Sequence, residues 1–263
     1  MRPSDLQNLK EFLDEQTTRF NVHSFIHADP ISIPHRFTKK EDREICGFLT
    51  SIISWGQRPI ILRNASLLME WMDHAPADFI LNHTPSERRP FKKFVHRTFN
   101  GEDAVYFLKA LQQFYRNHGG LEGTFETALK EASGTAEAIH NWRKLFLSFK
   151  SPGRTAKHFA DPLANSSAKR LCMYLRWMVR KDNNGVDFGL WKNISPACLY
   201  TPLDLHSGKT ARELGLLQRK QDDWKAVEEL TINLRKFDPE DPVKYDYALY
   251  GAGITERYQL TDF

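Results

Sequence analysis

The chain is poor in cysteine and has no long apolar run. Three cysteines occur in 263 residues, at Cys46, Cys172 and Cys198, and no two form a Cys-x-x-Cys pair. This excludes a zinc ribbon and a four-cysteine iron–sulfur cluster, and we expect no metal or other cofactor. Three thiols without an evident pairing favour a reducing compartment. No run reaches the roughly 18 apolar residues of a membrane span, and the chain start has no apolar signal core, so we expect a cytoplasmic protein.

Alternating apolar and polar residues, typical of half-buried strands, are scarce, and residues 197–201 are the best candidate. Apolar residues recur instead at helical spacing. This pattern predicts amphipathic helices over residues 4–17, 41–55, 59–72, 102–115, 135–149, 167–180, 205–214 and 223–237. The sequence has no internal repeat, low-complexity tract or long linker. It therefore predicts an all-α fold, a two-lobed helical bundle forming one domain over residues 1–263.

Positive charge is unevenly distributed. The net charge is only +4. The segment from Arg143 to Lys181 contains ten Lys or Arg and one acid, Asp161, a local charge of +9. The rest of the chain therefore carries −5, which is +4 less +9. A concentrated basic segment is typical of a protein that binds a polyanion, and a solvated helix face is the alternative.

The segment around Lys169 predicts the start of a helix that carries a candidate nucleophile. Asn165, Ser166 and Ser167 are strong N-cap residues, so we expect the helix to begin near Ser166 or Ser167. Backbone N–H groups at such a start bind phosphate. Lys169 falls in the first turn, where the helix dipole disfavours a cation and so favours a neutral, nucleophilic amine. The alternative is a surface lysine that contacts a phosphate.

Two further elements carry candidate functional residues. Asp204 directly precedes an amphipathic run, so it is expected to cap a helix, which contributes about 1 kcal/mol. A carboxylate in that place also stabilises positive charge that develops on a sugar. Trp55 and Gln57 lie at a helix break, where an indole and an amide are suited to stack on and hydrogen-bond an extruded base. The alternative is that Trp55 packs in a core.

Together these elements resemble the helix-hairpin-helix DNA glycosylase superfamily. The most specific match begins at Asp204 and has the family's spacing of His206, Lys209, Ala211, Leu214, Gly215 and Leu216, with Arg212 one place earlier than the usual arginine. The stretch Ile53–Gln57 resembles the family's Ile-Leu-Ser-Gln-Gln. The superfamily's Leu-Pro-Gly-Val-Gly hairpin is replaced by Asn165-Ser166-Ser167.

Within the superfamily, the archaeal 8-oxoguanine glycosylase branch is the most similar, because its nucleophilic lysine also opens a helix upstream of the aspartate. The resemblance implies a monomer that acts on oxidised purine in double-stranded DNA through a lysine Schiff base, with a lyase step that this intermediate permits. It implies catalytic roles for Lys169 and Asp204 and a base pocket with Trp55 and Gln57. The residues that it places against DNA are Asn165, Ser166, Ser167, Arg170, His206, Lys209 and Arg212.

The whole chain also resembles a bacterial family of conserved hypothetical proteins. The shared core reads Lys-Arg-Leu from Lys169 and Leu-Arg-Trp-Met-Val-Arg from Leu175. Two other functions stay open. The altered hairpin favours a DNA- or RNA-binding protein without chemistry, and a helical nuclease or other metal enzyme is the third class, although none of the ten histidines has convincing ligand spacing.

Overall fold

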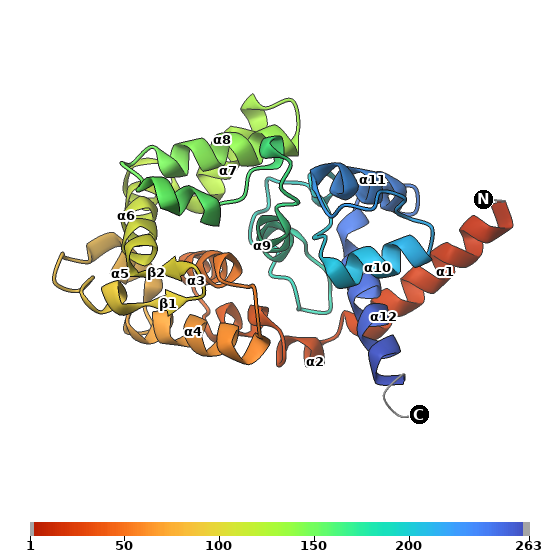
Figure 1. The fold of residues 1–263 in the computed structure, drawn as a ribbon, viewed down its shortest axis with the longest axis horizontal. Coiled ribbons are helices and arrows are strands. Elements are labelled where there is room, and N and C mark those ends of the chain that lie inside the picture. The colour runs from red at the N-terminus through yellow and green to blue at the C-terminus, as the bar shows by residue number, and fades with distance from the viewer. Residues whose placement is uncertain (1–2, 260–263) are drawn as a thin grey trace. The chain divides into compact units, whose positions relative to one another are not determined.

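The computed structural model describes residues 3–259, and residues 1–2 and 260–263 of the predicted domain lie outside this described part. Regular structure is almost entirely helical, which confirms the all-α fold (Figure 1). The chain divides into two compact units. Unit 1 contains residues 1–27 and 162–263, and unit 2 contains residues 28–161. Across the described residues, no helix combines the length and apolar character needed to span a bilayer.

Unit 2 consists of helices and one short hairpin. Its α-helices are α3 (Lys40–Ile52), α4 (Arg58–Glu70), α5 (Pro76–Asn82), α6 (Gly101–Asn117), α7 (Gly120–Glu131) and α8 (Thr135–Leu147). Its 3₁₀ helices are η1 (Pro30–Ser32), η2 (Pro34–Arg36), η3 (Pro90–Lys93) and η4 (Gly153–His158). The antiparallel strands β1 (Val95–His96) and β2 (Phe99–Asn100) form the hairpin that leads into α6.

Aromatic side chains form the centre of unit 2. Helix α7 packs on α6 and α8 (Figure 1). The Phe146 ring, from α8, lies between the rings of Phe48, Phe107 and Phe159, at centroid distances of 5.6, 4.8 and 5.1 Å. Phe146 is fully buried, as are Phe48 and Phe107. Tilted aromatic contacts of this kind add to the free energy of burial, so Phe146 is central to the stability of unit 2.

Unit 1 brings together both ends of the chain. Its α-helices are α1 (Pro3–Phe20), α2 (His23–Ile26), α9 (Lys169–Val179), α10 (Leu205–Glu213), α11 (Trp224–Arg235) and α12 (Asp246–Gln259). Its 3₁₀ helices are η5 (Pro162–Ala164), η6 (Pro196–Cys198) and η7 (Pro242–Tyr245). Helix α12 packs against both α1 and α10 (Figure 1). A Cβ at Gly251 would lie only 2.0 Å from the Phe20 ring, so glycine is what allows α1 to approach α12.

The structure corrects three local predictions. Residues 197–201 form no strand, because Ser195 accepts a hydrogen bond from the Ala197 amide and starts the 3₁₀ helix η6. The hairpin of β1 and β2 was not predicted, since two-residue strands leave no periodic pattern. The predicted helix over 41–55 ends at Ile52, and Trp55 therefore lies beyond the helix.

We expect Phe146→Ala to lower the free energy of unfolding by about 3–5 kcal/mol, because it opens a cavity among three other aromatic rings. Urea unfolding monitored by circular dichroism measures this. Val95→Ala in the same unit is the matched control, because Val95 is exposed and its loss should change stability by less than about 0.5 kcal/mol. Equal effects of the two substitutions would contradict the assignment of the core.

Candidate active site

The structure brings Lys169 and Asp204 together. Lys169 is the first residue of α9, and Asp204 is the residue that caps α10. Their Nζ and Oδ2 atoms lie 2.9 Å apart, with side-chain exposures of 35% and 23%. A pair that is neither fully buried nor fully solvated combines access for a ligand with reduced screening by water. The two residues that the sequence singled out thus form one contact within unit 1.

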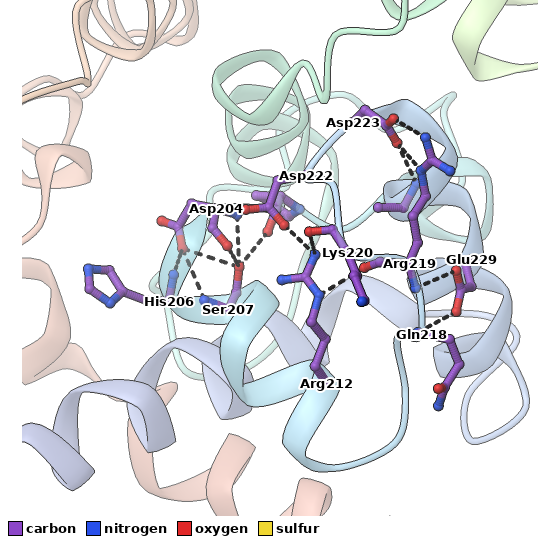
Figure 2. Close-up of polar contacts among 12 residues, drawn as sticks. Asp204, His206, Ser207, Arg212, Gln218, Arg219, Lys220, Asp222, Asp223 and Glu229 are labelled. Carbon is purple, nitrogen blue, oxygen red and sulfur yellow. Dashed lines mark hydrogen bonds and ion pairs between the residues drawn. The ribbon is translucent and has the colours of Figure 1, made fainter.

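Asp204 is held by its own helix. Its Oδ1 atom accepts hydrogen bonds from the His206 amide at 2.8 Å and the Ser207 amide at 3.0 Å, and Ser207 Oγ accepts from the Asp204 amide at 3.0 Å (Figure 2). This is the predicted N-cap in the form of a capping box. Because Oδ1 accepts the hydrogen bonds of the helix cap, the direction of Oδ2 is fixed, and Oδ2 contacts Lys169.

The charge of Asp204 is stabilised. Burial raises the pKa of Asp204, but the Lys169 ammonium and the amide hydrogen bonds outweigh burial and hold the pKa below its usual value. The carboxyl group is therefore ionised at neutral pH. An oriented carboxylate of this kind stabilises nearby positive charge and accepts a proton from a neighbouring amine.

The start of α9 differs from the prediction. The helix begins at Lys169, and its N-cap residue is Ala168, in the left-handed region at φ 47° without a side-chain cap. Neither Ser166 nor Ser167 caps it. Ser166 instead pairs through its backbone with Asp223, and its Oγ accepts a hydrogen bond from the Ala168 amide at 3.3 Å. This tertiary contact displaces the expected helix start by two residues.

Asp223 anchors the loop before α9. Its Oδ2 atom accepts a hydrogen bond at 3.0 Å from the side-chain amide of Asn165, which lies in the left-handed region at φ 62°. It also caps α11 and forms an ion pair with Arg219 (Figure 2). The hydrogen bond from Arg219 holds the pKa of Asp223 well below its usual range. The Asn165 amide, predicted to contact DNA, thus has a partner inside the fold.

A buried charge network lies along α9 behind Lys169. Arg176 and Arg180 follow Lys169 by seven and eleven residues, so all three share one helix face. Arg176 Nε lies 3.2 Å from Asp187, and Arg176 also forms an ion pair with Asp246 on α12. Arg180 pairs with the same Asp187 at 3.0 Å. Both arginines are only 3% exposed, so these pairs hold α9 in the interior of unit 1.

Asp246 is the residue beside the site that local sequence patterns do not reveal. It is 8% exposed and belongs to α12. Its pKa is raised to about 6, mainly by burial and also by the negative charge of Asp204, although Arg176 lowers it. Lys169 lowers it. Asp246 is therefore electrostatically coupled to both members of the Lys169–Asp204 contact. This coupling follows from proximity in three dimensions, which a local sequence pattern does not show.

The other residues predicted near DNA in unit 1 have different environments. Burial lowers the pKa of the Arg170 guanidinium to about 10. Lys209 is exposed and lies 3.4 Å from Glu213, one turn away. Arg212 donates to the Arg219 carbonyl at 2.8 Å and to Asp222 at 2.6 Å (Figure 2). Arg212 thus holds the loop after α10.

His206 differs from Arg212 because Figure 2 shows its ring directed away from the polar cluster around Asp204. Its backbone amide, by contrast, belongs to the cap of α10. The side chain of His206 therefore leaves α10 away from the internal hydrogen bonds of its cap.

Trp55 and Gln57 belong to unit 2. The guanidinium of Arg97 lies over the Trp55 ring, 5.0 Å from its centroid, and the buried His96 forms a hydrogen-bonding contact of 3.0 Å with the Trp55 carbonyl. Gln57 is exposed and caps α4 through its backbone. The sequence marks Arg97, in the turn between β1 and β2, as a possible second DNA contact or part of a solvated face. Its contact with a tryptophan 42 residues earlier was not predicted, because no local pattern connects the two.

The basic segment is less available to a polyanion than its sequence indicates. Five of its ten cationic residues form ion pairs inside the fold, namely Arg143, Arg154, Lys169, Arg176 and Arg180. The segment is also shared between the two units, which divide after Asp161. Much of the local charge of +9 therefore balances internal carboxylates.

We expect Asp204→Asn to lower the pKa of Asp246 from about 6, because the substitution removes a neighbouring negative charge. Carboxyl ¹³C NMR titration of the full chain measures this. Glu213→Gln is the control, because it removes an exposed charge from the end of the same helix. An unchanged Asp246 titration in Asp204→Asn, or an equal shift in both variants, would contradict the coupling.

Comparison with known proteins identifies the chain at the family level. No curated protein and no solved structure matches it. A family model described as protein of unknown function (DUF2400) matches residues 29–255. This range includes Lys169, Asp204 and Asp246, as well as the predicted conserved core in α9. The resemblance to an uncharacterised family is thereby confirmed, and the chain belongs to the DUF2400 family.

Proposed function

We propose that this protein is a DNA glycosylase that excises an oxidised purine, with 8-oxoguanine as the first substrate to test. The proposal rests mainly on one observation, the 2.9 Å contact between the Lys169 amine and the Asp204 carboxylate. The choice of lesion rests on the resemblance in sequence.

The geometry supports covalent chemistry at Lys169. The ammonium first releases one proton to solvent, which frees the amine's electron pair, and Asp204 Oδ2 lies 2.9 Å away, where it accepts the proton that Nζ loses once it is bonded to carbon. Nζ then forms a bond to C1′ of the damaged nucleotide while the glycosidic bond breaks and the base leaves with its electron pair, to be protonated. Loss of a second amine proton and opening of the sugar ring give a Schiff base, from which strand cleavage follows. Throughout, a carboxylate fixed by the α10 cap stabilises the cationic sugar.

DNA contacts in this proposal come from exposed or partly exposed groups on α10 and around the start of α9. Lys209 is exposed on α10, and the His206 ring points away from the internal hydrogen bonds. Arg170, Ser166 and Ser167 lie at the start of α9. Extrusion of the base costs a few kcal/mol of unstacking, which is least for damaged pairs.

The second candidate is a nucleic-acid-binding protein without chemistry on the same fold. The specific observation in its favour is that Lys169 and Asp204 already pair with each other, which leaves the amine without a free electron pair for attack. DNA binding that persists while no lesion in a broad panel is excised would support this second candidate over the first.

Lys169→Ala should abolish the covalent adduct that borohydride traps between the wild-type protein and a duplex containing 8-oxoguanine, because no amine remains to form the imine. Gel electrophoresis of the trapped complex measures this. Lys225→Ala is the control, because Lys225 is exposed on α11 and away from the contact. The proposal fails if wild type gives no adduct, or if Lys169→Ala gives as much adduct as Lys225→Ala.

Asp204→Asn distinguishes the helix-capping role of Asp204 from the role of its negative charge. Asparagine also caps helices well, so the free energy of unfolding should change by about 1 kcal/mol or less. Single-turnover excision should fall by about a hundredfold or more, because the carboxylate no longer accepts the amine proton or stabilises the sugar cation. A variant that is stable and fully active would show that Asp204 acts only as a cap.

A further inference from the structure

Unit 2 contains a hollow that the proposed chemistry does not use. Its volume is about 950 Å³, and it is lined by the end of η3, one side of α6 and the chain that follows α8. Pockets of roughly 300–1,000 Å³ are typical of sites for small molecules. Every lining residue belongs to unit 2, whereas Lys169 and Asp204 belong to unit 1.

Cationic side chains converge on this hollow from separate segments. Arg88 precedes η3, Lys92 lies in η3, Lys109 lies on α6, and Lys150 follows α8. Glu102 is the one acid of the lining, so the local net charge is +3, from four cations and one anion. A solvated helix face carries its charges along one element, whereas these four surround a common space. Such a space attracts a multiply charged anion.

The three lysines are not neutralised by the fold. Within the residues that the structure describes, Lys92, Lys109 and Lys150 form no ion pair. Arg88 is oriented by a 3.3 Å hydrogen-bonding contact with His83 Nδ1. This contrasts with Arg176 and Arg180, which are each paired with carboxylates. The lysine charges therefore remain for an external partner.

Two backbone features hold the lysines in place. A Cβ at Gly101 would lie 2.0 Å from the Lys92 carbonyl oxygen, so glycine is required for η3 to approach the start of α6. Lys150 lies in the left-handed region at φ 57°, a conformation that is unfavourable for a residue with a side chain. Strain of this kind is concentrated at ligand sites.

The remaining lining has a neutral polar part, with Gln112, Gln113 and Ser148, and an apolar part that includes aromatic rings. Val105, Tyr106, Phe149 and Pro152 contribute to it. The Tyr106 hydroxyl donates to the Phe146 carbonyl at 2.6 Å, so the polar end of this side chain is satisfied away from a ligand. A flat apolar ring fits this surface, and phosphate groups fit the lysines.

We propose that this hollow binds a nucleoside phosphate, with the ring on the apolar surface of Tyr106 and Phe149 and the phosphate among Lys92, Lys109 and Lys150. The ligand is either a free nucleotide or a nucleotide within a single strand, which share this chemistry. An acidic peptide fits less well, because its charges are spread along an extended chain whereas these lysines surround one space.

The test is calorimetric titration of the full chain with a purine mononucleotide, its unphosphorylated nucleoside and inorganic pyrophosphate. The nucleotide should bind more tightly than either fragment, because only the nucleotide uses both parts of the hollow. Lys109→Glu and Lys150→Glu should each weaken nucleotide binding by about tenfold or more. Lys39→Glu, at an exposed lysine elsewhere in unit 2, should leave binding unchanged. Absent binding to wild type, or equal weakening by Lys39→Glu, would overturn the proposal.

A competition experiment and two further variants extend this test. A single-stranded oligonucleotide that competes better than the mononucleotide identifies a strand as the source, and the reverse identifies a free nucleotide. Gly101→Ala should weaken binding because it displaces Lys92, and the lysine variants still decide the question where Gly101→Ala does not fold. Lys169→Ala should bind the nucleotide as wild type does, so this site stands or falls independently of the proposed glycosylase chemistry.

Discussion

The bridge that Arg176 forms between Asp187 and Asp246 is the interaction on which unit 1 depends. A buried charge is tolerated only when it is paired, and removal of one partner from such a group costs about 3–5 kcal/mol. Arg176 therefore fixes the rotation of α9 about its own axis. Because Lys169 shares that helix face, the same bridge determines where its amine points.

Helix capping and charge pairing are combined in a single carboxylate at Asp204. One oxygen satisfies backbone amides of α10, and the other contacts Lys169. A side chain held in this way loses little conformational entropy when a ligand arrives, because that entropy was lost on folding. The arrangement explains why a residue with an ordinary structural role is also suited to an electrostatic one.

Local features of the sequence predicted local structure well. The cap at Asp204 follows from an aspartate directly before an amphipathic run, and the long helices follow from apolar periodicity. The start of α9 was misplaced, because Ser166 pairs with Asp223, 57 residues later. The sequence singled out Asp246 by its position and Arg97 as a possible DNA contact, but it did not predict their partners, which lie on distant segments. Charge counting overestimated the basic surface, because sequence does not show which cations face internal carboxylates.

The division of unit 1 between the two ends of the chain has a consequence for biosynthesis. Residues 28–161 are contiguous, so unit 2 can fold as soon as it leaves the ribosome. Helix α1 is synthesised before unit 2, whereas its partner α12 is synthesised after unit 2. Until then the apolar face of α1 has no native partner, and the loop that joins the two must be closed at an entropic cost. Unit 1 therefore completes its packing after unit 2, and α1 is the segment that waits longest for its native partner.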